Sequence, residues 1–87
     1  MRWSIDVIVM PKTGVSDPQG QAVRGGLAML GFSGVEDVRV GRHISLEVVA
    51  DDADAARQAT KQMAERLLAN PVIEMFTVCE PRRVGGG

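Results

Sequence analysis

The side chains that could carry nucleophilic or metal-binding chemistry are few in this chain of 87 residues. It has a single histidine, His43, and a single cysteine, Cys79, too few for the zinc sites that proteins build from several such ligands. Cys79 also has no basic neighbour in sequence that would favour a reactive thiolate. We therefore predict that the chain holds no catalytic residue and no metal ligand.

Neither the glycines nor the acidic pairs form a motif for phosphate or cofactor binding. Gly25 and Gly26 fall inside a predicted helix, where each costs about 1 kcal/mol relative to Ala, so we expect close packing there. The run Gly-Phe-Ser-Gly at 31–34 follows that helix, whereas a phosphate loop opens one. Asp51 and Asp52 precede a second predicted helix, and the dipole of a helix favours negative charge at its start. We predict no cofactor-binding residue.

Three basic residues, Lys12, Arg39 and Arg42, could instead bind a partner. Arg39 and Arg42 flank a predicted hairpin turn at Gly41-Arg42, from which a long cationic side chain can reach a carboxylate or a phosphate. An ordinary solvated hairpin tip explains the same residues equally well.

Composition favours a single small globular domain over residues 1–80, with a disordered tail at 81–87. A net charge of −1 and 3% aromatic residues argue against nucleic acid as a partner. The longest apolar runs are too short for a membrane span, and the start of the chain is not typical of a signal peptide. One cysteine excludes an internal disulfide and favours a reducing compartment, so we predict a cytoplasmic protein.

Hydrophobic periodicity predicts six elements in the order β-α-β-β-α-β. Asp17-Pro18 is a strong helix start, because Asp caps the first turn and Pro fits its first position, and Gly31 ends that helix. Asn70-Pro71 ends the second helix. The second helix is expected to face inward with Ala56, Ala59, Met63 and Leu67. The predicted strands are 3–10, 35–40, 44–49 and 72–80, and the predicted helices are 17–31 and 51–68.

This order predicts an α+β fold of ferredoxin-like topology, a two-layer domain with a four-stranded antiparallel sheet and two helices on one face. The last strand is apolar on both sides, and Ile73 and Met75 fall on the side away from the helices. Burying apolar surface stabilises a protein by about 25 cal/mol per Å², and an exposed apolar face loses this free energy. The uncovered face therefore predicts a homo-oligomer in which a second copy covers it.

The chain also resembles the small PurS-type subunit of phosphoribosylformylglycinamidine synthase. The resemblance is carried by DPQG at 17–20, LGF at 30–32, VEDVRVGR at 35–42 and LLANPVIE at 67–74. These segments cover nearly the whole domain in order and spacing. Gly25-Gly26 and the tail after Glu80 depart from the pattern.

The resemblance implies a non-catalytic adaptor in de novo purine biosynthesis. Such a subunit forms dimers or tetramers and joins a glutaminase subunit to a large synthetase subunit, so that ammonia passes between them. The complex is a ligase that uses ATP, Mg and glutamine, none of which this chain is expected to bind. The contact residues we expect are Asp17, Pro18, Gln19, Gly20, Arg39, Gly41 and Arg42.

Two other functions remain open from the residues alone. A ferredoxin-like regulatory module would bind an amino acid or a nucleotide at a subunit interface, and it would show saturable binding by the isolated chain. A free-standing enzyme of acylphosphatase type would need an anion-binding loop, which Lys12 to Ser16 does not resemble.

Overall fold

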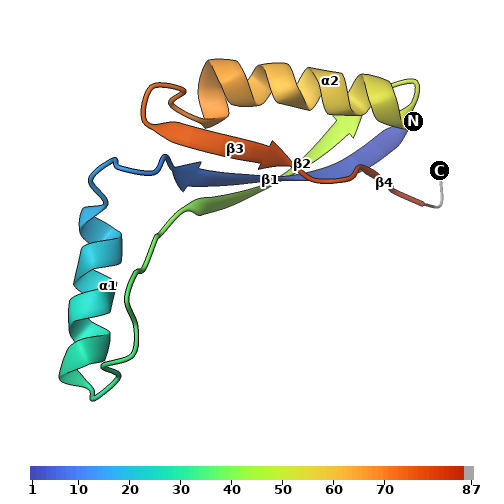
Figure 1. The fold of residues 1–87 in the computed structure, drawn as a ribbon. Helices are drawn as coiled ribbons and strands as arrows, with labels where there is room; N and C mark the ends of the chain where they lie inside the picture. Colours follow the sequence, from blue (N-terminus) through green and yellow to red (C-terminus); the bar gives the residue numbers. More distant parts are fainter. Residues whose placement is uncertain (86–87) are drawn as a thin grey trace.

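The sheet is built around one long central strand. The computed structural model describes residues 1–85, and in it β1 (Arg2–Pro11) pairs antiparallel with β2 (Arg42–Val49) on one side. On the other side β1 pairs with β3 (Glu74–Val78) and then with β4 (Arg82–Arg83), which follow one another along its length (Figure 1). The predicted α+β class, with a four-stranded antiparallel sheet and two helices, is confirmed.

The core lies between this sheet and one helix. Alternation along β1 places Ile5, Val7 and Val9 on the covered face, where all three are fully buried. Val7 and Val9 form a cluster with Ala64 and Ala69. The half-buried residues that pack against this cluster are Ile44, Leu46, Leu68, Phe76 and Val78.

The covering helix is α2 (Ala53–Met63), which continues into the π-helical turn η1 (Ala64–Leu68). Its buried stripe is Ala56, Thr60 and Ala64, small residues that let the helix approach the sheet closely. Thr60 can be buried because its hydroxyl donates a hydrogen bond of 2.9 Å to the Ala56 carbonyl.

The prediction that Met63 and Leu67 face the core is wrong. Met63 is 39% exposed and Leu67 is 84% exposed, because the contact stripe follows the smaller residues. The wide turn of η1, closed by the hydrogen bond from Ala69 N to Ala64 O, changes the helical phase, and Leu68 packs on the core instead of Leu67.

The other helix, α1 (Pro18–Met29), does not lie on the sheet. It points away from the end of β1 and has scarcely any contact with other elements. Residues 32–41 then return beside it in extended form and lead straight into β2 (Figure 1). We call residues 17–41 the arm. The prediction of two helices on one face is therefore wrong within a single chain.

The expected strand 35–40 and its hairpin turn at Gly41-Arg42 are also absent from the described residues. The segment is extended, yet it pairs with no strand within residues 1–85. Gly41 passes so close to the end of β1 that a Cβ there would collide with the Val9 carbonyl and the Met10 sulfur. The chain therefore passes close to the end of β1 at this point and makes no hairpin turn.

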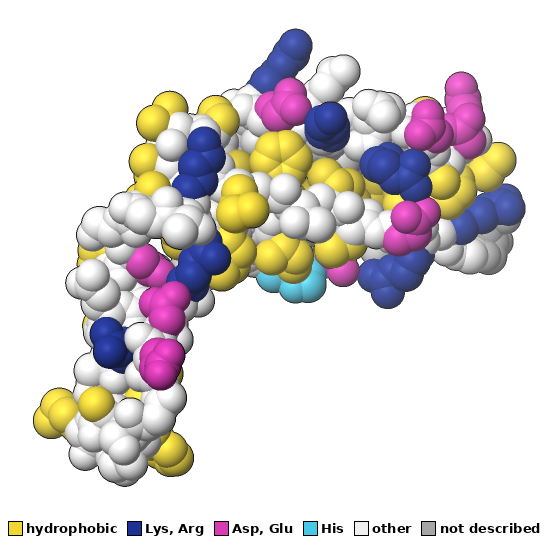
Figure 2. Space-filling model, in the orientation of Figure 1, with side chains coloured by type: hydrophobic (Ala, Val, Ile, Leu, Met, Phe, Trp, Pro, Cys, Tyr) yellow, Lys and Arg dark blue, Asp and Glu magenta, His cyan; other side chains and the backbone are white. Residues whose placement is uncertain are grey.

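The arm makes the molecule elongated. Its Cα radius of gyration is 16.7 Å, whereas a compact domain of this length has about 12 Å. The space-filling view shows the arm standing clear of the sheet, with apolar side chains at its far end (Figure 2). An isolated copy of the chain therefore leaves one of its two helices without a packing partner.

The C-terminal segment is ordered further than predicted. Pro81 is buried, and β4 pairs Arg83 with Trp3 and Arg82 with Ser4. The Val84 amide donates to the Arg2 carbonyl at 2.9 Å. The prediction of disorder from residue 81 is wrong for this stretch, and residues 86–87 lie outside the described residues. Within residues 1–85, the helices are too short and too polar to cross a membrane.

We predict opposite effects for two glycine substitutions in α1. A Cβ at Gly20 would collide with the Val38 carbonyl and the Asp17 carboxylate, so Gly20→Ala should separate α1 from the returning segment. A Cβ at Gly25 would meet nothing within 4 Å, so Gly25→Ala should stabilise the helix of the monomer by up to about 1 kcal/mol. Limited proteolysis of the arm measures both, and equal cleavage of the two variants would contradict this packing.

Candidate functional site at the hinge of the arm

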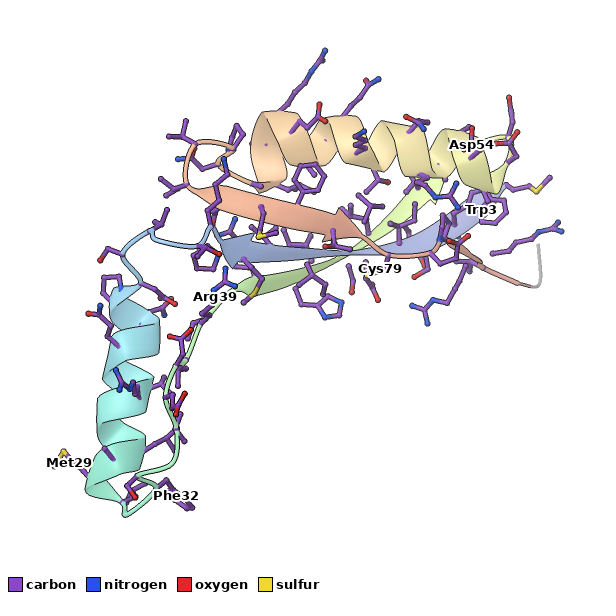
Figure 3. All side chains as sticks on the ribbon, viewed as in Figure 1. Trp3, Met29, Phe32, Arg39, Asp54 and Cys79 are labelled. Carbon is purple, nitrogen blue, oxygen red and sulfur yellow. The ribbon has the colours of Figure 1, made fainter. Side chains whose placement is uncertain are left out.

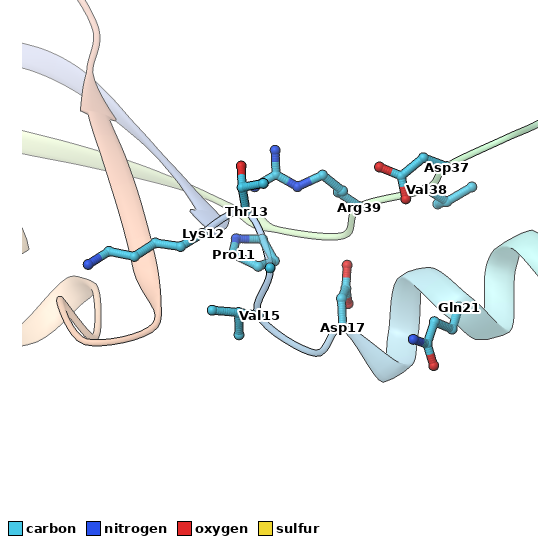
Figure 4. Close-up of a pocket in the computed structure, with 10 residues that line it drawn as sticks. Pro11, Lys12, Thr13, Val15, Asp17, Gln21, Asp37, Val38 and Arg39 are labelled. Atoms are coloured by element: carbon cyan, nitrogen blue, oxygen red, sulfur yellow. The ribbon is translucent and has the colours of Figure 1, made fainter.

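The predicted contact residues come together where the arm leaves the sheet. One cleft there, of about 240 Å³, is lined by residues that include Asp17 and Arg39 (Figure 4). A second cleft of about 380 Å³ is lined by residues that include Pro18, Gln19 and Arg42. Asp17 lines both clefts. We call this region the hinge.

Asp17 joins the two parts of the arm, the start of α1 and the segment that returns to β2. Its Oδ1 accepts a hydrogen bond of 3.0 Å from the Gly20 amide and caps α1, as the sequence predicts. Its Oδ2 accepts a hydrogen bond of 3.0 Å from the Val40 amide, which lies on the returning segment. These two amides, that of Gly20 first, hold the pKa of Asp17 below its ordinary value of 3.8.

Arg42 ties the base of the arm to the domain. Its guanidinium binds both carboxylate oxygens of Glu74, at 2.8 and 3.1 Å, and donates to the Leu68 carbonyl at 2.7 Å. Glu74 also accepts a hydrogen bond of 2.8 Å from the backbone amide of Asn70. Arg42 first and the Asn70 amide second lower the pKa of Glu74, and Glu74 raises the pKa of Arg42. Sequence reasoning missed this internal role for Arg42; its contact with another subunit stays a prediction.

The other two basic side chains differ from each other. Lys12 donates a hydrogen bond of 2.6 Å to the Pro71 carbonyl and so holds the turn before β3. Arg39 is exposed and makes no hydrogen bond or ion pair with any of residues 1–85. Figure 3 shows it beside the hinge, where it is available to a partner. Most charged groups of the hinge are thus already engaged in holding it together.

The open face of the sheet is half apolar and half polar, not apolar throughout as predicted. Near the hinge it carries Ile8, Met10 and Met75, of which Met75 is 51% exposed. Further along β1, Asp6 accepts a hydrogen bond of 2.9 Å from Ser45 and lies 3.4 Å from His43 Nε2. The arrangement places the carboxylate between the serine and the histidine, so the histidine is not positioned to activate that hydroxyl.

Several groups complete the polar half of this face. Arg82 reaches the same carboxylate at 3.6 Å. The Ser45 hydroxyl first, and then His43 and Arg82, lower the pKa of Asp6 against the opposing effect of burial. Sequence reasoning missed this cluster, because strand register alone brings His43 and Ser45 opposite β1. Cys79 is half-buried at the end of β3, as a free thiol.

The far end of the arm carries a cluster of exposed apolar residues. Met29 is 90% exposed, and Leu30 and Phe32 beside it are exposed as well. Figure 3 shows Met29 and Phe32 extending from the tip into open space. Exposed apolar clusters of this kind mark contacts with another protein. The predicted packing partner for Gly25 and Gly26 is also missing within the described chain.

The fold and the hinge define a small α+β domain with a braced arm and uncovered apolar surfaces. These features are typical of a subunit that works inside a larger assembly. A sequence profile for PurS, described as phosphoribosylformylglycinamidine (FGAM) synthase, matches residues 4–80. The PurS subunit of that synthase from Mycobacterium leprae is 45% identical over 74 residues, which cover 83% of this chain and 87% of that one. The chain therefore belongs to the PurS family, the small subunits of a ligase complex of purine biosynthesis.

Solved structures agree with this assignment. PurS of Thermus thermophilus has a TM-score of 0.85 at 35% identity, over 98% of this chain and all 100% of that chain. A chain in the structure of PurLQS from Thermotoga maritima has a TM-score of 0.84 at 31% identity, over 92% of this chain and 98% of that chain. The arm, the sheet and the covering helix are therefore shared features of the family fold.

We predict that acid weakens the hinge. The folded-state pKa values of Asp17 and Glu74 lie below the ordinary values of 3.8 and 4.5, so their contribution to stability is present above those values. It is lost as the pH falls through the lowered folded-state values. Glu74→Gln should therefore lower the stability at neutral pH and flatten its dependence on pH below about 5.

Thermal unfolding followed by circular dichroism between neutral and acidic pH tests this. Glu65→Gln is the matched control, because the Glu65 side chain is exposed and makes no hydrogen bond or ion pair within residues 1–85. If Glu74→Gln and Glu65→Gln gave the same profile, the Arg42–Glu74 pair would not be bracing the hinge.

Proposed function

We propose that this chain is a non-catalytic adaptor that joins a glutaminase subunit to a large synthetase subunit within phosphoribosylformylglycinamidine synthase. In that role it docks the two enzymes so that ammonia released from glutamine passes to formylglycinamide ribonucleotide. ATP, Mg and glutamine are used by the complex and are not bound by this chain. A cytoplasmic location fits this chemistry and the single free cysteine.

The observation that carries the proposal is the arm. An unpartnered helix with an apolar tip is held at a fixed angle by Asp17 and Arg42, so the chain offers two separated surfaces on one braced frame. Free ammonia is readily protonated and diffuses away, so a transfer between two active sites needs both proteins docked in a fixed relation. A spacer can supply that relation without touching the substrate.

The alternative, a module that binds a small molecule, is less well supported by the hinge. Asp17, Lys12 and Arg42 already hydrogen-bond to other parts of the chain, and little polar capacity is left for a ligand. The first hinge cleft, about 240 Å³, is smaller than ligand pockets, which run from about 300 Å³ upward, and the second, about 380 Å³, is at the low end of that range. Saturable binding of glutamine or a purine nucleotide by the isolated chain would favour the alternative.

A homo-oligomer is part of the proposal. The apolar half of the open face, with Ile73 and Met75 at its border, forms one candidate surface between copies. The resemblance to the PurS family implies a dimer or a tetramer, and the tetramer needs a second interface that the arm can provide.

We predict that omitting this chain impairs glutamine-dependent synthesis much more than ammonia-dependent synthesis. The reconstituted glutaminase and synthetase subunits are assayed with glutamine and then with an ammonium salt, each with and without this chain. Ammonium at high concentration supplies the synthetase directly and bypasses the docking step. Equal loss of both activities would contradict the bridging role and would point to a direct effect on the synthetase.

We also predict that Met75→Asp dissociates the oligomer, because an unpaired carboxylate is costly to bury in an apolar contact. Met75 is half exposed in the single chain, so the variant should still fold. Gln58→Asp is the control, since it adds the same charge at an exposed position of α2, which covers the opposite face of the sheet. Sedimentation velocity distinguishes them, and an unchanged profile for Met75→Asp would remove this surface from the interface.

A further inference from the structure

The end of the sheet away from the hinge is basic. Arg2 begins β1 there, and β4 consists of Arg82 and Arg83, and all three side chains are exposed. Because a strand rises about 3.3 Å per residue, the length of β1 places this end about 30 Å from the hinge. Figure 2 shows basic side chains at this end of the sheet. We call these three arginines the basic end.

A hollow of about 400 Å³ lies at the basic end. The residues that line it include Arg2 and Arg83 together with the apolar Val49 and Val84, and no acidic residue of the described chain lines it. The guanidinium groups of Arg2 and Arg83 make no hydrogen bond or ion pair with any of residues 1–85. Two positive charges therefore border the hollow without a counter-charge from their own chain.

The nearest acidic groups of the sheet do not neutralise these charges. Asp6 is already engaged, because it accepts a hydrogen bond of 2.9 Å from Ser45 and lies 3.6 Å from Arg82. Strand register places Asp6 and Glu47 on rows of the sheet that are closer to the hinge than the row of Arg2. The chain as a whole has a net charge of −1, so the basic end is a local exception to its charge balance. What fits the hollow is an anionic group from outside the chain.

The hollow suits an acidic protein surface better than a small anion. A single ion pair between exposed groups contributes little, because water and salt screen it, so exposed arginines hold a free phosphate or carboxylate weakly. A protein surface brings several carboxylates at once and also covers the apolar floor, where Val49 is 77% exposed. Each guanidinium can bind a carboxylate with two parallel hydrogen bonds, and arginine is enriched in protein–protein contacts.

The place of the basic end in the molecule fits an adaptor. A subunit that bridges two enzymes needs two contact surfaces that do not compete for the same space. The hinge with its arm supplies one, and the basic end lies at the opposite end of β1. Its three arginines all lie outside residues 4–80, the part of the chain that the PurS profile matches, so the family assignment does not describe this surface.

We propose that the basic end is the second docking surface of this subunit and that it binds an acidic surface on one of the two enzymes that the chain bridges. Arg2 and Arg83 pair with carboxylates of that enzyme, and its apolar side chains cover Val49 and Val84. This inference rests on the bridging function proposed above and assigns one of the two contacts to a surface.

Charge reversal on the intact chain tests the inference. Arg2→Glu/Arg83→Glu should raise the dissociation constant for one of the two enzymes by about tenfold or more, because attraction becomes repulsion at two positions. The affinity for the other enzyme should not change, since its contact is about 30 Å away. Arg2→Gln/Arg83→Gln should give a smaller increase, because it removes the attraction without adding repulsion. Both side chains are exposed, so the variants should fold.

Lys61→Glu/Arg66→Glu is the matched control. It makes the same change in net charge at two exposed positions of the covering helix, where neither side chain has a hydrogen bond or an ion pair within residues 1–85. Binding of each purified enzyme to each variant is measured at several salt concentrations. The wild-type affinity for the enzyme at the basic end should fall as the salt rises from about 50 to 300 mM, and the Gln variant should lose most of this dependence.

The outcomes separate this inference from the bridging function. A wild-type chain that binds neither enzyme would overturn the bridging and this inference with it. Unchanged binding of both enzymes by Arg2→Glu/Arg83→Glu would overturn the inference alone, and so would an equal loss in the control. Saturable binding of inorganic phosphate that Arg2→Gln/Arg83→Gln lacks would assign the hollow to a small anion instead. Dissociation of the homo-oligomer by the Glu variant would assign it to a contact between copies.

Discussion

One carboxylate determines the shape of this molecule. One carboxylate oxygen of Asp17 accepts a hydrogen bond from the Gly20 amide, and the other accepts one from the Val40 amide. The two bonds connect the start of α1 to a segment that lies more than twenty residues later in the chain. Without that bridge, the one remaining side-chain hydrogen bond between the helix and the returning segment, within residues 1–85, is the long one of 3.4 Å from Arg24 Nε to the Val35 carbonyl. Gly20 is the residue that lets the two backbones come close enough for a single side chain to span them.

The second constraint lies at the base of the arm. Arg42 begins β2, and its guanidinium reaches both the end of η1 and the first residue of β3. A planar donor that binds a carboxylate with two hydrogen bonds fixes direction as well as distance. The direction of the arm is therefore set by the same residue that joins three elements of the domain. For an adaptor this matters more than total stability, because docking two enzymes requires a spacer of constant geometry.

Much of this architecture was accessible from local sequence signals. Asp17-Pro18 marks the start of α1, and Gly31 adopts a positive φ of 96° at its end, because both depend on backbone preferences that act within a few residues. Alternation predicted the strand at 3–10 for the same reason, but it left open which of its two sides is buried. The residues expected to contact other subunits lie together at the hinge, although their mutual hydrogen bonds were not predicted and their contacts with other subunits stay a prediction.

Two of the errors share one physical origin. Residues 35–40 alternate as a strand does, and alternation is the same whether a segment pairs with its own sheet, with another chain or with water. The position of α1 likewise depends on what its apolar residues touch, which periodicity does not report. The exposed Leu67 was missed because a single π-helical turn shifts the phase of all residues that follow it. The first two failures concern tertiary or quaternary partners, whereas the third comes from a local change in helix geometry.

These partners also bear on how the arm is stabilised. A helix of 12 residues is at the lower limit of what survives in water without tertiary contacts, a limit of about 12–15 residues. Two adjacent glycines, Gly25 and Gly26, weaken α1 further, and the Asp17 cap strengthens only its first turn. The last turns of α1 must therefore gain their stability from whatever covers Met29 and Leu30. Folding of the arm and assembly of the complex are then coupled, and part of the binding free energy is spent on ordering this helix. A subunit built in this way presents a well-formed spacer only when its partners are in place.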